Sequence, residues 1–122
     1  DMNNPADVVE RYFRAMQVGE AAGDQLLALF ADDAVYVEPF SGTERTHEGR
    51  AAIEACFRAG WAQTPPELTL EVNRVDVDGA VVRSEWTCRS PAFPAPVRGV
   101  DVCTVQDGRI ARLEVRFLEA AS

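Results

Sequence analysis

The apolar residues change their spacing near the middle of the chain, and this change predicts the fold class. Up to residue 61 they recur at helical spacing, whereas from residue 68 they alternate with polar residues as in strands. Helices followed by strands are typical of α+β domains, not of parallel α/β sheets. We therefore predict one α+β domain over residues 1–122, with three N-terminal helices packed on a curved antiparallel sheet.

Each predicted helix has its own boundary signals. The first begins at Asn4 and Pro5, because asparagine can cap a helix and proline suits its first position. Its apolar stripe comprises Val8, Val9, Tyr12, Phe13 and Met16. The second is predicted over residues 25–31, and the third over residues 50–61, before two prolines that prevent its continuation.

Turn residues divide the second half of the chain into strands. Asp78-Gly79 and Asp107-Gly108 lie between alternating runs, which is a strong signal for tight hairpins. Residues 90–96 contain three prolines and must leave the sheet. A short strand at residues 34–39 and a polar loop at 40–48 come earlier. The later strands are predicted from residue 68 to the first hairpin, then over 81–89, 97–106 and 109–118.

The expected layers enclose an apolar space. A sheet of long strands twists, and three helices over one face leave a concavity that is the usual place for a ligand. We therefore expect an α+β roll shaped as a cone with an internal pocket. In the last strand Leu113, Val115 and Phe117 share the face that should contact the helices.

Asp101 is out of place on its strand. It shares a face with Cys103 and Val105, while Val100 and Val102 lie on the opposite face. Both faces are therefore expected to be partly covered, and the second could form a subunit interface. An aspartate that points inward among such neighbours loses solvation, which favours its neutral form and raises its pKa.

Tyr12 and Glu38 are the other polar groups expected near the pocket. A buried tyrosine hydroxyl usually needs a partner. Glu38 ends a strand in register with Tyr36, and it could lie at the pocket rim or face outward. The structural alternatives are that Tyr12 belongs to the core, that Glu38 is a solvated strand end, and that Asp101 pairs with Arg98.

Several segments carry a resemblance to a known family. They are residues 8–12 (VVERY), 29–34 (LFADDA), 38–39 (EP), 49–53 (GRAAI) and 100–101 (VD). In order and spacing the chain resembles the Δ5-3-ketosteroid isomerases, and more broadly the superfamily with the nuclear transport factor two fold. Polyketide cyclases, scytalone dehydratase and limonene epoxide hydrolase belong to that superfamily. The likeness extends to Phe117 and is specific for the fold.

The resemblance implies a role for each polar group. The isomerases use a carboxylate base before a proline, a tyrosine on the first helix and a protonated aspartic acid on a late strand. Glu38, Tyr12 and Asp101 match these positions. The base would move a proton beside a ketone while the two donors stabilise the dienolate oxygen. Two differences stand out: the family base is aspartate, and Phe57 replaces a family tyrosine that hydrogen-bonds the oxyanion tyrosine.

The implied function is isomerisation of a hydrophobic carbonyl compound, steroid or polyketide-like, through an enolate. The alternatives are a polyketide cyclase-like or dehydratase-like enzyme, or a non-catalytic module that binds a small ligand or dimerises. The expected catalytic residues are Tyr12, Glu38 and Asp101. The expected substrate-binding residues are Phe57, Trp61, Trp86, Val115 and Phe117.

Charge and composition argue against several other classes of partner. The chain has 12 lysines and arginines against 20 acidic residues, and its net charge of -8 disfavours nucleic acids and anionic membranes as partners. We expect a cytoplasmic homodimer that needs no cofactor. No apolar run reaches the length of a membrane span, and no signal peptide is recognised.

The sequence does not indicate a metal-binding or nucleophilic role for its cysteines, its histidine or Ser84. Three cysteines, Cys56, Cys88 and Cys103, match no metal-binding spacing and are expected to be reduced. His47, the only histidine, lies in a polar loop and is expected to be solvated. Cys56 and Ser84 have no neighbouring base in the sequence, so nucleophilic catalysis is not expected. We therefore predict no metal site.

Overall fold

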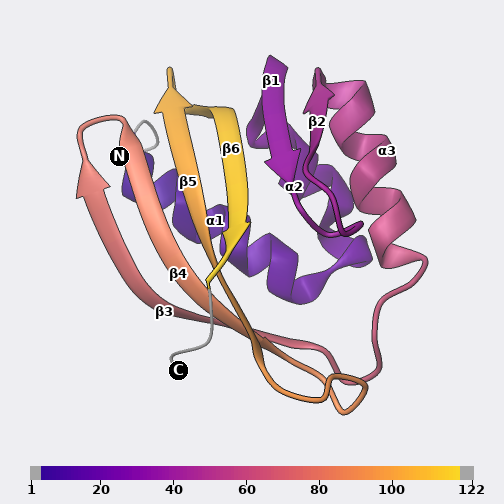
Figure 1. The fold of residues 1–122 in the computed structure, drawn as a ribbon. Coiled ribbons are helices and arrows are strands. Elements are labelled where there is room, and N and C mark those ends of the chain that lie inside the picture. Colours follow the sequence, from indigo (N-terminus) through magenta and orange to yellow (C-terminus); the bar gives the residue numbers. More distant parts are fainter. Residues whose placement is uncertain (1–3, 119–122) are drawn as a thin grey trace.

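Three helices cover one face of a curved six-stranded sheet in the computed structural model, which describes residues 4–118 (Figure 1). The elements, in chain order, are α1 Pro5–Val18, the 3-10 turn η1 Glu20–Ala22, α2 Gly23–Ala28, β1 Phe30–Glu38, β2 Arg45–Glu48, α3 Arg50–Trp61, β3 Thr69–Asp78, β4 Val81–Arg89, β5 Val97–Gln106 and β6 Arg109–Phe117. The predicted α+β architecture is confirmed.

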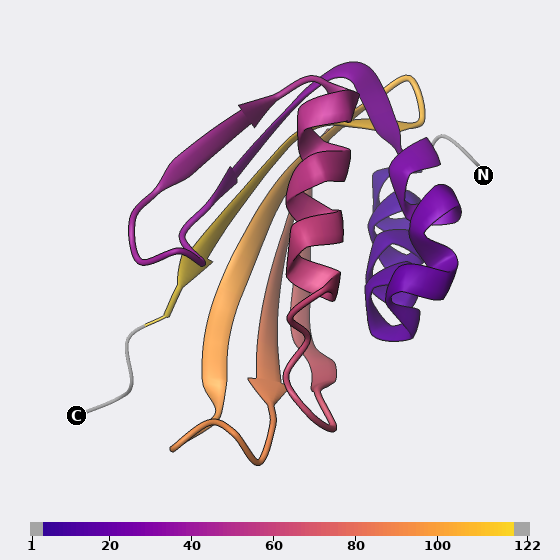
Figure 2. The same ribbon diagram turned by 90° about the vertical axis from the view of Figure 1, so that its right-hand side faces the viewer.

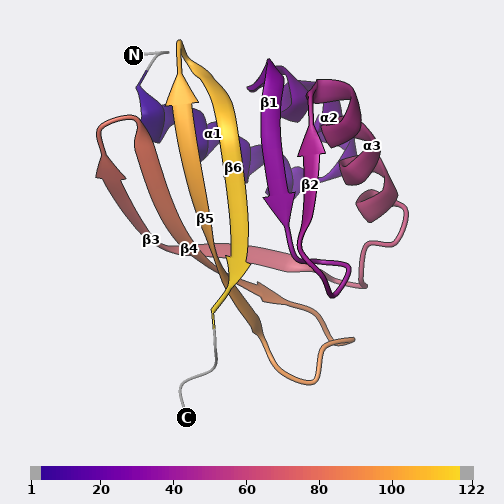
Figure 3. The ribbon, with the colours of Figure 1, turned by 45° about the horizontal axis from the view of Figure 1, so that its top comes forward.

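The strands are ordered β2-β1-β6-β5-β4-β3, and Figure 3 shows them from β3 at one edge to β2 at the other. We predicted antiparallel pairing throughout, but β1 and β6 are parallel, with Tyr36 opposite Leu113. The remaining pairs are antiparallel. The sheet is therefore mixed. Strands β3 to β6 form a consecutive antiparallel run, and β1, which comes earlier in the chain, pairs with its last strand, β6.

All helices lie on the same side of the sheet, as the view in Figure 2 shows. α1 packs over β3, β4 and β5, while α3 packs over β1 and β2. α1 starts where Asn4 Oδ1 accepts a hydrogen bond from the Ala6 amide at 2.9 Å, and it ends at Gly19, whose φ is 90°. Its apolar stripe is buried against the sheet, which fixes Tyr12 in the layer between helix and strands.

Two predicted boundaries near β1 are wrong. The helix expected over residues 25–31 ends at Ala28, and Asp32 and Asp33 belong to β1. The loop expected over residues 40–48 contains β2. β2 is a mostly exposed edge strand, and its residues do not alternate between apolar and polar. Hydrophobic periodicity therefore does not predict it.

The core lies between the helices and the inner face of the sheet. As predicted from strand alternation, Leu113 and Val115 are buried there. Phe117, on the same strand, is 48% exposed and contacts Phe40 instead of the helices, with the two ring centroids 5.5 Å apart. Between residues 4 and 118, no helix is long and apolar enough to cross a membrane.

Gly99 permits one close contact within the sheet. It lies opposite Trp86 in the pairing of β4 with β5, and a Cβ at Gly99 would lie 2.1 Å from Trp86 Cζ2. A glycine within a strand often marks such an approach. The indole can therefore lie directly over the β5 backbone, where a methyl group would displace it.

We predict that Gly99→Ala lowers the free energy of unfolding by about 1–3 kcal/mol, because the added methyl group overpacks the site and forces Trp86 to move. Urea denaturation measures the loss, and near-ultraviolet circular dichroism reports the indole. Gly60→Ala is the matched control, since no atom lies within 4 Å of a Cβ there and alanine is favoured in α3. Equal stability of the two variants would contradict the prediction.

Candidate functional site

Two carboxylates lie within the apolar interior. Glu38, the last residue of β1, is 0% exposed, and Asp101 in the middle of β5 is 4% exposed. The sequence does not decide whether Glu38 lies at the pocket rim or faces outward. The structure places it inside. Buried charges are costly unless other groups satisfy them, so the partners of each carboxylate determine its chemistry.

Glu38 is surrounded by hydrogen-bond donors. Its Oε1 accepts from the Phe40 amide at 2.8 Å, and its Oε2 lies 2.8 Å from both Arg45 Nε and His47 Nε2. Burial alone would raise the pKa of Glu38, but the hydrogen bonds from His47, Phe40 and Arg45 together lower it below its ordinary value. Glu38 is therefore ionised at neutral pH.

The hairpin of β1 and β2 brings these donors together. Arg45 lies directly opposite Glu38, and His47 lies opposite Tyr36. The imidazole of His47 stacks on the Tyr36 ring with centroids 5.8 Å apart, and the His47 side chain is only 17% exposed. The expectation that His47 is solvated was wrong, because β2 and its register were not visible in the sequence.

Asp101 has a different environment. Its Oδ1 accepts a hydrogen bond from Trp86 Nε1 at 2.8 Å. Burial raises the pKa of Asp101 to about 7, and the indole hydrogen bond opposes this only in part. Within the described residues Asp101 forms no ion pair, so the alternative in which Arg98 neutralises it is wrong. At neutral pH a large fraction of Asp101 is protonated.

Tyr12 is held in the same interior. It is buried, and its ring makes edge contacts with Phe13 and Phe30 at centroid distances of 5.2 and 6.1 Å. Burial, and secondly the charge of Asp101, raises the pKa of Tyr12 well above its ordinary value. Tyr12 is therefore a neutral hydroxyl at neutral pH, and a negative charge on Asp101 further disfavours its ionisation.

Ser84 adds a polar group that the sequence did not single out for binding. It lies directly opposite Asp101 in the pairing of β4 with β5 and is completely buried. Its Oγ has no hydrogen-bond partner among the described residues. A buried hydroxyl without a partner is rare, and it can take a hydrogen bond from a ligand or a water beside Asp101.

The five residues expected to contact substrate occupy different places. Phe57 and Trp61 stack on each other along α3 with centroids 5.9 Å apart, and Phe57 also contacts Tyr36. Trp86 contacts Asp101 from β4, whereas Phe117 lies on the half-exposed end of β6. Val115 is buried opposite Asp101. Their contact with a substrate stays a prediction.

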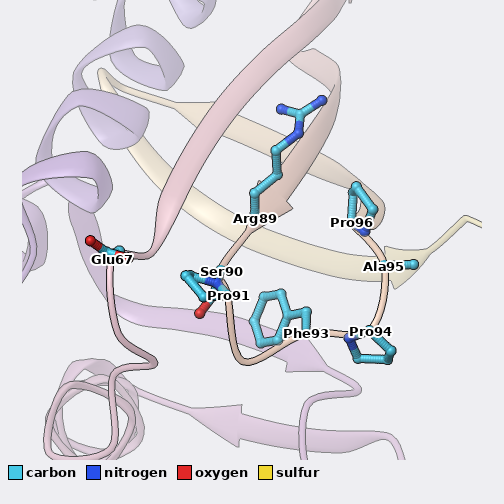
Figure 4. Close-up of a pocket in the computed structure, with 8 residues that line it drawn as sticks. All are labelled: Glu67, Arg89, Ser90, Pro91, Phe93, Pro94, Ala95 and Pro96. Carbon is cyan, nitrogen blue, oxygen red and sulfur yellow. The ribbon is translucent and has the colours of Figure 1, made fainter.

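Two surface pockets of about 400 Å³ each are present in the described part of the molecule. Figure 4 shows one of them, which is formed by the proline-rich loop after β4 around Phe93 and by Glu67. The other lies between α1 and α2. Neither is lined by the two buried carboxylates or Tyr12, so the internal pocket stays a prediction.

The helix-covered, curved mixed sheet has the nuclear transport factor two-like α+β fold. The chain belongs to the SnoaL-like domain family, which it matches over residues 9–113. No curated protein matches it.

Solved structures agree with this family. A proposed polyketide cyclase from Sinorhizobium meliloti is similar with 29% identity and a TM-score of 0.76, covering 90% of this chain and 94% of that one. A proposed ketosteroid isomerase from Kribbella flavida shares 22% identity with a TM-score of 0.76, covering 97% and 80%. An NTF2-like protein of unknown function from Mesorhizobium loti shares 23% identity with a TM-score of 0.78, covering 94% and 91%.

We predict that Asp101 makes the protein less stable as the pH rises. Its folded-state pKa of about 7 exceeds the ordinary value of 3.8, so between these two pH values the folded state binds more protons than the unfolded state. The contribution of Asp101 to the free energy of unfolding therefore falls as the pH rises from 3.8 to about 7 and is constant above that. Asp101→Asn should therefore gain stability relative to wild type from pH 4 to pH 7, by at most roughly 4 kcal/mol. Chemical denaturation across this range measures the difference, and a constant difference would contradict the prediction.

Proposed function

We propose that this protein is an enzyme that moves a proton through an enolate in a hydrophobic carbonyl compound, as a ketosteroid isomerase does. The observation that carries the proposal is the contrast between two buried carboxylates: Glu38 has three hydrogen-bond donors, one of them cationic, whereas Asp101 has the neutral indole of Trp86. The pKa of Glu38 is lowered, whereas that of Asp101 is raised to about 7. Groups whose surroundings separate their pKa values in this way are candidates for a paired base and acid.

In the proposed reaction, Glu38 acts as the base. Its carboxylate takes a proton from the carbon next to the substrate carbonyl. The electron pair of the C–H bond forms a new C=C bond, and the π pair of the carbonyl moves onto its oxygen. The neutral Tyr12 hydroxyl and the protonated Asp101 donate hydrogen bonds to the resulting dienolate oxygen. Glu38 then returns the proton further along the conjugated system, so the double bond moves and no oxidant is needed.

The environment of Glu38 affects this role in two ways. The donors Arg45, His47 and the Phe40 amide keep the carboxylate ionised and fix its position. They also make it a weaker base, because each hydrogen bond stabilises the charged form. A substrate with an acidic C–H bond, between a carbonyl group and a double bond, is therefore the best match.

A second candidate is cyclisation of a polyketide-like substrate. The proposed cyclase from Sinorhizobium meliloti, at 29% identity, favours it. In this case the same enolate would attack a second carbonyl carbon, and Asp101 could donate its proton to the new alkoxide. A non-catalytic binding module would place Glu38 in solvent and Asp101 in a salt bridge, and the described residues show neither arrangement. One feature favours it, because neither surface pocket is lined by the two carboxylates.

We predict that wild type isomerises a Δ5-3-ketosteroid and that two substitutions remove most of the rate. Glu38→Gln removes the base and should lower kcat by roughly 10²–10⁴-fold. Asp101→Ala removes an oxyanion donor and should lower kcat by roughly 10²–10³-fold. Ultraviolet absorbance of the conjugated product measures turnover.

Glu114→Gln is the matched control for the base. Glu114 also has a lowered pKa, because hydrogen bonds from Arg112 and Arg116 outweigh its partial burial, but it alternates with Leu113 and Val115 and so faces away from the helices. This variant should retain full activity. Absence of turnover by wild type would refute the steroid assignment. Turnover that ignores both Glu38→Gln and Asp101→Ala would refute the assigned roles.

The pH dependence of kcat/KM should be bell-shaped. Activity rises as Glu38 ionises below the ordinary glutamate pKa, and it falls near pH 7 as Asp101 loses its proton. Asp101→Asn keeps a neutral donor at every pH, so the fall near pH 7 should disappear. If kcat/KM of Asp101→Asn falls near pH 7 as it does in wild type, a group other than Asp101 causes the fall.

A further inference from the structure

Three metal-ligating side chains converge on the inner side of the β1–β2 hairpin. They come from separate elements: Glu38 from β1, His47 from β2 and Cys56 from α3. One donor atom from each lies within 4.8 Å of the others. The distances separating these residues along the sequence match no metal motif, so only the fold reveals the cluster.

We propose that Cys56, His47 and Glu38 form a binding site for Zn²⁺ or a similar borderline-soft divalent ion. A thiolate, an imidazole and a carboxylate are all zinc ligands. Mg²⁺ and Ca²⁺ are disfavoured, because they prefer oxygen ligands throughout. Three protein ligands leave the fourth tetrahedral position open for water or another small ligand.

The surroundings suit such an ion. The Phe40 amide hydrogen-bonds Glu38 Oε1, as neighbouring groups commonly do for metal-bound carboxylates. The Tyr36 ring holds the imidazole in place. A Cys56 thiolate and the Glu38 carboxylate would supply two negative charges, which offset the charge of the ion.

Arg45 is the one unfavourable neighbour, since its cation lies 2.8 Å from the carboxylate oxygen that His47 also contacts. Its side chain is about half exposed, so it can turn toward solvent while Glu38 binds the ion. His47 and Cys56 are both partly exposed, which leaves a route for the ion to enter.

Binding must displace one proton. Burial, and secondly the charge of Glu38, raises the pKa of the Cys56 thiol, so it is protonated in the metal-free protein. The ion replaces this proton on Sγ, and His47 Nε2, which contacts Glu38 Oε2 in the metal-free protein, becomes a metal ligand. Because the thiol proton is released on binding, the affinity should rise with pH.

The test is a titration of the full chain with Co²⁺, which has visible absorption in tetrahedral sites and a sulfur charge-transfer band when a thiolate binds. We expect one ion per chain, displacement by Zn²⁺ and tighter binding at higher pH. Cys56→Ser should abolish the charge-transfer band, and His47→Ala should weaken binding by about tenfold or more.

Cys88→Ser is the matched control. Cys88 is a second half-buried thiol whose pKa burial raises, but it does not belong to the Glu38 cluster. The Cys88→Ser variant should bind Co²⁺ as tightly as wild type does. Thermal melts verify that every variant folds, and Zn²⁺ should raise the Tm of wild type and of Cys88→Ser but not that of Cys56→Ser.

Three results would each overturn the site: no cobalt band at millimolar Co²⁺, an unchanged band in Cys56→Ser, or loss of the band in Cys88→Ser. Metal binding and turnover are measured separately, so either proposal can fail without the other. If both hold, Zn²⁺ should inhibit isomerisation in wild type, because it occupies the carboxylate of the proposed base. Cys56→Ser should escape that inhibition.

Discussion

Two carboxylates buried in one apolar interior impose the main physical constraint on this fold. Neither group can remain there as a charge without donors. For Glu38 the donors come from the β1–β2 hairpin, through Arg45, His47 and the Phe40 amide. For Asp101 the donor is the indole of Trp86, which reaches it only because Gly99 leaves space on β5. The strand register is thus what makes both burials possible.

The number and charge of those donors separate the two acids. Glu38 has three donors, one of them an arginine, and these outweigh the cost of burial, so its charged form persists. Asp101 has one neutral donor, and burial dominates. One interior therefore holds a carboxylate and a carboxylic acid at the same pH. An apolar core with ordinary salt bridges would not produce this difference, because each acid would be ionised.

Strand alternation placed Asp101 on one face with Cys103 and Val105, so its inward position and raised pKa followed once that face was the inner one. The pairing with an arginine stayed open until the structure showed the partners of Asp101. Strand alternation was not enough for Glu38 and His47. Their placement depends on β2, a short exposed strand without apolar residues at alternate positions, and on the parallel pairing of β1 with β6. Such contacts are set by tertiary packing, which a local pattern does not contain.

The two differences from the isomerase pattern belong to one local arrangement. Phe57 offers no hydroxyl, and its ring packs instead against Phe30, Tyr36 and Trp61. That packing supports Tyr36, on which the His47 imidazole stacks, and His47 in turn contacts Glu38. Among the described residues, the hydrogen bonds are thus centred on Glu38 and not on Tyr12. A glutamate, longer than aspartate by one methylene, can reach those donors while it remains on the inner face. The fold is shared across the family, whereas the donors around Glu38 come from the β1–β2 hairpin of this chain.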